Sequence, residues 1–185
     1  MQHTSIRVHG FTLIELLMGI AVLAVMLTLA APSYGKLIGR THGRTAHNEI
    51  DTALNLARLT AVSQVKHVVM CPSSDGQQCA ATTQWQNGWL VFADLDHDGA
   101  HSADEPVIRV AQAQPAGVAI LSTTGRRRVT YQPDGSASGS NVTLTICDRV
   151  AGAENATSLV INQAGRVRSA RATTAAAAAC LNVVG

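Results

Sequence analysis

A run of about twenty apolar residues near the start of the chain limits what this sequence can fold into. The run extends from Phe11 to Ala30, and Glu15 is its one charged side chain. A helix of this length is about 30 Å long, which matches the hydrocarbon core of a bilayer. A carboxylate within such a helix costs on the order of 3 kcal/mol near its middle and less near its end. The sequence therefore predicts a helix buried in lipid or among other helices, with a partner for Glu15.

That partner can come from the chain itself if it is cleaved after Gly10. Cleavage there would make Phe11 the new N-terminus, whose α-amine is a cation. Phe11 and Glu15 are four residues apart, so they lie on one face of a helix. In a bundle of identical helices, the amine of one subunit could then neutralise the carboxylate of its neighbour.

The residues around this bond resemble a known processing site. After a short leader with Arg7 as its fixed cation, Gly10 is followed by FTLIEL, which resembles type IV pilins and type II secretion pseudopilins. The resemblance implies that a prepilin peptidase cuts after Gly10 and methylates Phe11, and that the helix moves from the inner membrane into a filament core. A secretory signal peptide or a plain membrane anchor are the alternatives. The apolar run is too long for a typical signal peptide, and neither alternative needs Glu15.

The rest of the chain is long enough for one domain. The protein has 185 residues, 46% hydrophobic and 14% charged, with a net charge of +2. Without the leader and the apolar helix about 150 residues remain, enough for a core of their own. Because the net charge is small, binding of a polyanion depends on where arginines cluster. Aromatic residues are 3% of the chain, which argues against a platform that stacks exposed bases.

Apolar periodicity predicts one further helical segment and then strands. Pro32 and the glycines at 35, 39 and 43 indicate either a deformable neck or a close-packed small-residue helix face. An apolar stripe with helical spacing runs from about Thr45 to Gln64, and its members are Ile50, Ala53, Leu54, Ala57 and Ala61. Period-two segments follow at 65–71, 88–93, 106–112, 118–121, 128–131, 142–147 and 157–161. The alanine-rich tail at 173–179 is of low complexity.

One long helix followed by many strands predicts an α+β fold, with the helix packed on antiparallel sheet. The resemblance to pilins implies the same fold, in which the hydrophobic helix continues into the amphipathic one. We expect a cleaved leader at 1–10, a transmembrane or filament-core helix at 11–31, a neck and amphipathic helix at 32–64, and a β-rich periplasmic head at 65–185.

The four cysteines predict two disulfides, because an N-terminal anchor would deliver the head to an oxidising compartment. Three pairings are possible, and we favour the pairs nearest in sequence, Cys71 with Cys79 and Cys147 with Cys180. The chain-entropy model gives these bonds roughly 2.6 and 3.8 kcal/mol.

An acidic segment satisfies the EF-hand template for Ca²⁺ through Asp94, Asp96, Asp98 and Glu105. Its flanks read as strands rather than helices. We therefore predict a hairpin whose aspartates form Asx turns and stay solvated, with no metal and no other cofactor. The resemblance to GspH/FimT-type minor pilins implies a similar acidic hairpin. His97 and His101 would suggest Zn²⁺, but hydrated loop histidines are commoner.

Arginines near the C-terminus form a candidate DNA-binding site. In a strand, Arg166 and Arg168 would point to one side about 6.7 Å apart, which is about two phosphate steps along a DNA strand. The sequence from Gly165 to Arg168 resembles the GRxR motif of FimT-type minor pilins, which take part in DNA uptake. The resemblance implicates Gly165, Arg166 and Arg168 directly. Further candidates are Arg171, by proximity, and Arg126, Arg127 and Arg128, by charge alone.

These features predict a minor type IV pilin of the GspH/FimT type that binds DNA without sequence preference. No P-loop, G-x-S-x-G or H-E-x-x-H motif is present, so we expect no enzyme. The alternative is a minor type II secretion pseudopilin, whose head binds other pseudopilins or secreted protein, and Ca²⁺-dependent adhesion comes third. Expected partners are other pilins, the prepilin peptidase and DNA. We expect the protein in the inner membrane and then in the filament.

Overall fold

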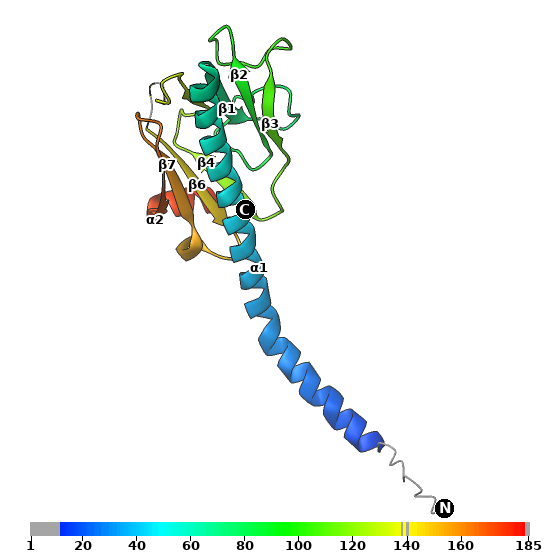
Figure 1. Cartoon of the computed structure of the whole chain (residues 1–185). Coiled ribbons are helices and arrows are strands. Elements are labelled where there is room, and N and C mark those ends of the chain that lie inside the picture. The colour runs from blue at the N-terminus through cyan, green and yellow to red at the C-terminus, as the bar shows by residue number, and fades with distance from the viewer. Residues whose placement is uncertain (1–11, 138, 140, 184–185) are drawn as a thin grey trace, which may run out of the picture.

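The computed structural model describes residues 12–137, 139 and 141–183 (Figure 1). It consists of a long helix α1 (Leu13–Gln64), a head of two antiparallel sheets, and a short helix α2 (Thr174–Leu181). This confirms the predicted α+β fold. The predicted cleavage site at Gly10 and Phe11 lies outside the described residues.

The first turn of α1 is closed by Thr12 and Glu15. The Thr12 hydroxyl accepts the Glu15 N–H at 3.3 Å, and the Glu15 carboxylate accepts the Thr12 N–H at 3.5 Å. This reciprocal pair is a capping box, which the sequence analysis missed. In the single subunit, the Glu15 carboxylate therefore has a hydrogen-bond partner in the backbone of the first turn.

The stalk formed by the first half of α1 projects away from the head (Figure 1). Between Leu13 and Leu27, the leucine, isoleucine, valine and methionine side chains are 55–79% exposed. A continuous apolar surface of this kind marks a region that other molecules cover. Within the described part of the chain, no helix is both long enough and apolar enough to cross a membrane.

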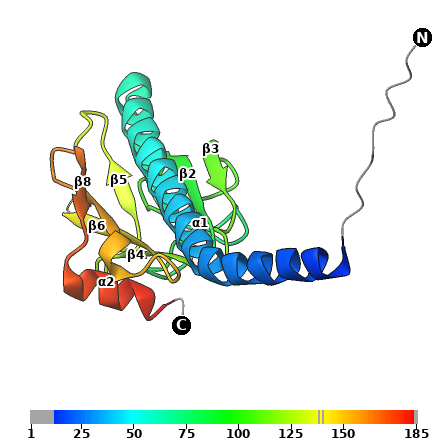
Figure 2. The ribbon, with the colours of Figure 1, turned by 90° about the horizontal axis from the view of Figure 1, so that it is seen from below.

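The predicted neck is helical, because α1 runs through it without a break. Figure 2 shows that the helix bends between the stalk and the part that packs on the head. Gly39 is buried, and a Cβ there would collide with the Asp148 carboxylate and lie 3.0 Å from the Ala151 nitrogen. Of the two interpretations, this contact fits the close-packed small-residue face.

Eight strands build the two sheets of the head. The first sheet has the order β3-β2-β1-β5 and comprises β1 (His67–Pro72), β2 (Trp89–Asp94), β3 (Val107–Ala111) and β5 (Val129–Tyr131). The second has the order β4-β6-β7-β8 and comprises β4 (Val118–Ser122), β6 (Val142–Asp148), β7 (Thr157–Ile161) and β8 (Val167–Arg171). The seven predicted strands are present. The first begins at His67 rather than Val65, because Val65 ends α1 in the left-handed region with φ of 53°.

The core lies where α1 meets the inner faces of both sheets. The predicted stripe is fully buried, since Ile50, Ala53, Leu54, Ala57 and Ala61 are each 0% exposed. Strand alternation then divides β1. Val68 and Met70 face this core, whereas Val69 and Cys71 join a small outer cluster.

The alanine-rich tail, for which the sequence analysis predicted no element, forms helix α2. Alanine has the highest helix propensity, and the Thr173 hydroxyl caps the first turn by accepting the Ala176 N–H at 3.2 Å. Ala177 and Cys180 pack on Ala119 and Cys147, so the second sheet lies between α1 and α2 (Figure 2).

The short 3₁₀ helix η1 (Ala153–Asn155) follows β6. Both favoured disulfides are present, Cys71–Cys79 and Cys147–Cys180.

The close packing at Gly39 predicts that Gly39→Ala destabilises the head by about 1–3 kcal/mol. The Asp148 carboxylate cannot move aside easily, because it accepts the N–H groups of Val150 and Ala151, both at 2.9 Å. Gly43→Ala is the matched control, since its Cβ would lie 4.0 Å from the Asp148 Cβ. This control should be neutral or gain up to about 1 kcal/mol of helix propensity. Urea unfolding measures both, and equal stabilities of the two variants would contradict the prediction.

Candidate nucleic-acid interface

The turn before β8 fixes where the candidate arginines begin. The Gly165 N–H donates to the Asn162 carbonyl at 2.9 Å, and the Arg166 N–H donates to the Asn162 side-chain oxygen at 3.0 Å. Gly165 has φ of 72°, and a Cβ there would collide with the carbonyl oxygen of Gly135. Only glycine fits this turn without strain. The glycine of the GRxR sequence therefore shapes the backbone that presents the arginines.

Arg58 of α1 fastens this turn to the rest of the head. Its Nε donates to the Gly135 carbonyl at 2.9 Å, and its Nη2 donates to the Ala164 carbonyl at 3.3 Å. The sequence analysis missed Arg58, because one arginine beside an apolar helix stripe looks like solvated charge. The turn is thus held by backbone and side-chain bonds before any ligand binds.

Arg166 directly precedes the edge strand β8, and Arg168 lies on the outer face of that strand. Val167, between them, packs against the main core, while Arg168 pairs with Val160 and is exposed. Arg166 is exposed as well, and if the period of two continues back from β8, its side chain lies on the same side as Arg168. Within the described residues, neither guanidinium group has an ion-pair or hydrogen-bond partner.

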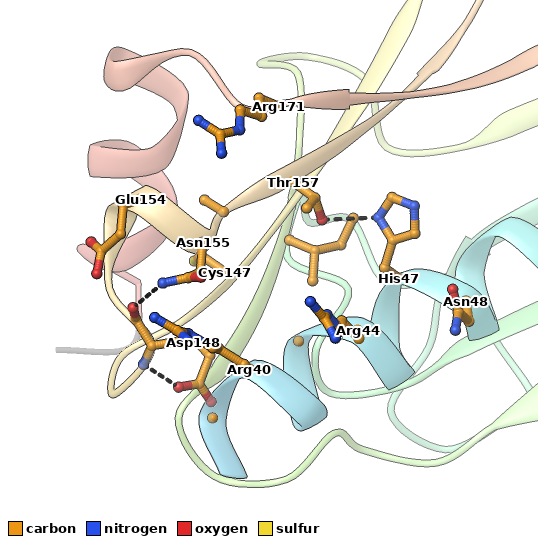
Figure 3. A pocket seen from close by; sticks show the side chains of 15 residues that line it. Arg40, Arg44, His47, Asn48, Cys147, Asp148, Glu154, Asn155, Thr157 and Arg171 are labelled. Atoms are coloured by element: carbon orange, nitrogen blue, oxygen red, sulfur yellow. Dashed lines mark hydrogen bonds between the residues drawn. The ribbon is translucent and has the colours of Figure 1, made fainter. Parts of the chain in front are cut away.

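Arg171 belongs to the opposite face of β8. With Arg40 and Arg44 of α1, it lines a groove of about 240 Å³ between the helix and the second sheet (Figure 3). The structure therefore separates Arg171 from the Arg166 and Arg168 surface, although all three are close in sequence. The four-residue spacing of Arg40 and Arg44, which puts them on one helix face, is the signal that could have identified the groove.

The groove carries more positive than negative charge. Its acidic members are Asp148 and Glu154, against the three arginines. One oxygen of Asp148 accepts the backbone N–H groups of Val150 and Ala151, so these dipoles compensate part of its charge.

His47 joins α1 to the two strands that border this groove. Its Nδ1 lies 2.9 Å from the Thr157 hydroxyl of β7, and its Nε2 lies 3.0 Å from the Ser169 hydroxyl of β8. Burial lowers the pKa of His47 below 6.5, while the Asp51 carboxylate acts in the opposite direction. The neutral imidazole therefore bridges the helix to the strand that carries the arginines.

The arginines at 126–128 do not form one basic surface. Arg126 donates to the Gly139 carbonyl at 3.2 Å. Arg128 precedes β5 and donates to the Gly99 carbonyl at 2.9 Å, so it lies on the acidic hairpin. Arg127 is exposed.

The acidic hairpin connects β2 to β3 and is only partly as predicted. The Asx turns are present, since Asp96 accepts the Asp98 N–H at 3.2 Å and Asp98 accepts the Ala100 N–H at 2.6 Å. Asp94, however, is buried at 2% exposure, which corrects the expectation of solvated aspartates. The strand that contains Asp94 is covered on both sides, and this burial raises the pKa of its carboxyl.

Both loop histidines have other contacts. The His97 ring stacks on His67 with the ring centroids 3.9 Å apart. His101 lies 2.6 Å from the Gln77 carbonyl and 3.1 Å from the Glu105 carbonyl. Among the described residues, the group suited to a metal ion contains only Asp94, Asp96 and Asp98.

The fold and two family models identify the class of protein. A model described as "Prokaryotic N-terminal methylation motif" matches residues 6–31, and the long helix with its β-rich head is the fold of type IV pilins. A second model, described as "Type II transport protein GspH", matches residues 46–165, which is more than half of the chain. The chain therefore belongs to the GspH family, whose GspH/FimT-type members are minor type IV pilins and pseudopilins.

Several proteins of Pseudomonas aeruginosa are similar to this chain. Two, each described as "Fimbrial protein", are 28% and 27% identical over 117 residues, or 63% of this chain and 68% of theirs. Two crystal structures of the type IV minor pilin FimU match with TM-scores of 0.57 and 0.54 at 22% and 20% identity. They cover 74% and 71% of this chain and 92% and 94% of the FimU chains, which confirms the fold. The methylation motif implies processing by a prepilin peptidase and assembly with other pilins.

The lowered pKa of His47 predicts a pH-dependent stability. As the pH falls through 6.5, the unfolded state takes up a proton before the folded state does, so the free energy of unfolding decreases. Between about pH 7.5 and pH 5.5, the free energy of unfolding should fall less in the His47→Gln variant than in the wild type. Urea unfolding at both pH values measures the difference.

His42→Gln is the control, because it removes a histidine of the same helix that has no hydrogen bond to either sheet among the described residues. If the His47→Gln variant and the wild type lose equal unfolding free energy on acidification, the prediction is wrong.

Proposed function

We propose that this protein is a filament-associated minor type IV pilin that binds DNA through β8 during DNA uptake. The observation that carries the proposal is the presentation of Arg166 and Arg168. Both are exposed and have no internal partner among the described residues. Arg166 stands at the end of the turn held by Gly165 and Arg58, and Arg168 lies on the edge strand that follows. A planar guanidinium group can bind phosphate oxygens through two hydrogen bonds, and the backbone that carries this pair is held before any ligand binds.

The contacts proposed here are to phosphate rather than to bases. The aromatic side chains of the head, Trp85, Trp89, Phe92 and Tyr131, are each 0% exposed and cannot stack on bases. Neither helix of the described chain offers a recognition surface for the major groove. The second half of α1 packs on the head, its first half is an apolar stalk, and α2 has eight residues. Binding should therefore be independent of DNA sequence.

The groove between α1 and the second sheet supplies a second set of cations. Arg171, Arg40 and Arg44 line it on the other side of β8 from Arg168. A nucleic-acid strand that bends over the edge of β8 would meet both sets. We propose the outer pair as the primary contact and the groove as a secondary one.

Replacing both outer arginines should weaken DNA binding for every DNA sequence alike. For Arg166→Gln/Arg168→Gln, we expect a loss of roughly 10–100-fold, because two charge-assisted phosphate contacts disappear. The slope of log K against log salt should become less negative by about 1.8, since each phosphate contact contributes about 0.9. Gel-shift titrations of the full mature chain in detergent, at several salt concentrations, measure both quantities.

The matched control is Lys36→Gln/Arg149→Gln. It removes the same charge, but Lys36 lies on the stalk side and Arg149 follows β6 at the other end of the second sheet. If both double variants lose the same DNA affinity, the loss reflects net charge alone, and the assignment of the site to β8 is wrong. Unchanged binding by the Arg166→Gln/Arg168→Gln variant would do the same.

The proposal includes the path from membrane to filament. The leader at 1–10 is removed, the helix at 11–31 anchors the chain in the inner membrane, and the apolar stalk then packs among other pilin helices. The exposed apolar side chains of the stalk support this path. Within the filament, the α-amine of Phe11 replaces the capping interaction as a partner of a Glu15 carboxylate.

Intact-mass spectrometry tests the processing step. The mature protein should begin at Phe11 and carry one added methyl group on its α-amine. The variant Gly10→Val should keep the leader, since the peptidase would lose its cleavage position. A mature chain that begins at any other residue would contradict the proposed processing.

A minor pseudopilin of a type II secretion system is the second candidate. The description of the matching family model as a type II transport protein favours it. In that role the head would bind other pseudopilins or secreted protein, and the double arginine variant would affect secretion without any salt-dependent DNA binding by the wild type.

A further inference from the structure

Three carboxylates converge where β2 ends. Asp94 is the last residue of β2, and Asp96 and Asp98 follow it in the hairpin loop. One oxygen of each lies within 4.8 Å of the others. Among the described residues, no lysine or arginine forms an ion pair with any of the three.

The buried member of this cluster has an unsatisfied oxygen. Asp94 is 2% exposed, and its Oδ1 has no hydrogen-bond donor among the described residues. Buried carboxylates in proteins are paired with a cation, hydrogen-bonded or bound to a metal, because an uncompensated charge away from water is very costly. The backbone N–H groups of His97 and Gly99 hydrogen-bond to the Asp94 carboxyl, so they occupy its other oxygen and leave Oδ1 without a donor.

We propose that Asp94, Asp96 and Asp98 bind a divalent cation of the Ca²⁺ type. Ca²⁺ takes six to eight oxygen ligands in flexible geometry, which three carboxylates and solvent on the exposed side of the loop can supply. Zn²⁺ fits less well, because it prefers histidine and cysteine ligands and the cluster contains neither.

The site differs from an EF-hand in the use of Glu105. The Glu105 carboxylate accepts the Leu95 N–H at 2.6 Å and the Ser102 N–H at 3.0 Å, and it is buried. It therefore shapes the loop that brings the aspartates together instead of completing the ligand set. Arg128 supports the same loop through the Gly99 carbonyl, and a Cβ at Gly99 would collide with its guanidinium group.

The cation would bind in the β2–β3 connection, at the end of the head remote from the stalk (Figure 1). Asp94 pairs with His67 on β1, and so the site lies next to the end of α1. Binding should stabilise this end of the first sheet. The proposed DNA contacts lie on the second sheet, so the two proposals can fail separately.

The test uses the full mature chain in detergent, stripped with a chelator and titrated with CaCl₂ in a calorimeter up to about 10 mM, the range of weak extracellular sites. We expect saturable heat for one ion per chain and a rise of several degrees in the thermal midpoint. MgCl₂ at the same concentrations should bind more weakly, since Mg²⁺ demands stricter geometry. Absence of saturable heat together with an unchanged midpoint would overturn the proposal.

Variants separate the cluster from general surface charge. Asp96→Asn/Asp98→Asn, at two exposed positions, should weaken Ca²⁺ binding at least tenfold while the metal-free protein stays folded. Asp94→Asn should also abolish binding, and its metal-free form should be at least as stable as the wild type, because it removes a buried charge. Asp104→Asn is the matched control, an exposed acid of the same loop outside the cluster, and it should bind like the wild type. Equal affinity in the control and in Asp96→Asn/Asp98→Asn would refute the site.

Discussion

The packing of one face of α1 against both sheets is the contact on which the rest of the head depends. Alanines at 46, 53, 57 and 61 bring the helix backbone close to the strands, and Ile50 and Leu54 fill the space between the sheets. Each sheet presents one apolar face, which needs a cover that the other sheet alone does not provide. Because the same helix continues into the stalk, the position of the head relative to the stalk follows from this contact and from the close approach at Gly39.

The candidate interface depends on the same helix. Arg58 holds the turn before β8, and His47 holds the strand itself through Ser169. An edge strand has neighbours on one side only, so these side chains of α1 replace part of the support that a further strand would give. The arginines of β8 are therefore surface residues on a backbone that the core positions, which is the arrangement a preorganised phosphate contact requires.

Local patterns in the sequence were sufficient for most of the fold. The period of the apolar residues predicted the buried stripe from Ile50 to Ala61 and seven strands, and the spacing of the cysteines favoured the two observed disulfides. The failures involve contacts between distant segments. Helix α2 is stable because Cys180 and Ala177 pack on the second sheet, and Arg171 faces α1 because β8 pairs in one particular register. Neither fact is encoded within a short window of sequence, and the same holds for the burial of Asp94, which depends on the covering of β2 from both sides.

The net charge of the chain is only +2, but positive and negative side chains gather on different sheets of the head. Three carboxylates cluster at the end of β2 in the first sheet, whereas five arginines lie at the start of β8, on it and along the adjacent groove of the second sheet, namely Arg166, Arg168, Arg171, Arg40 and Arg44. At physiological ionic strength, fields are screened over about 8 Å, so each region acts mainly on what approaches it closely. The proposed DNA contact at β8 is therefore little affected by the distant hairpin, and a cation bound by the aspartates would lower the negative charge there without changing the charge at β8. The proposed binding of DNA thus depends on the distribution of charge over the head rather than on its total.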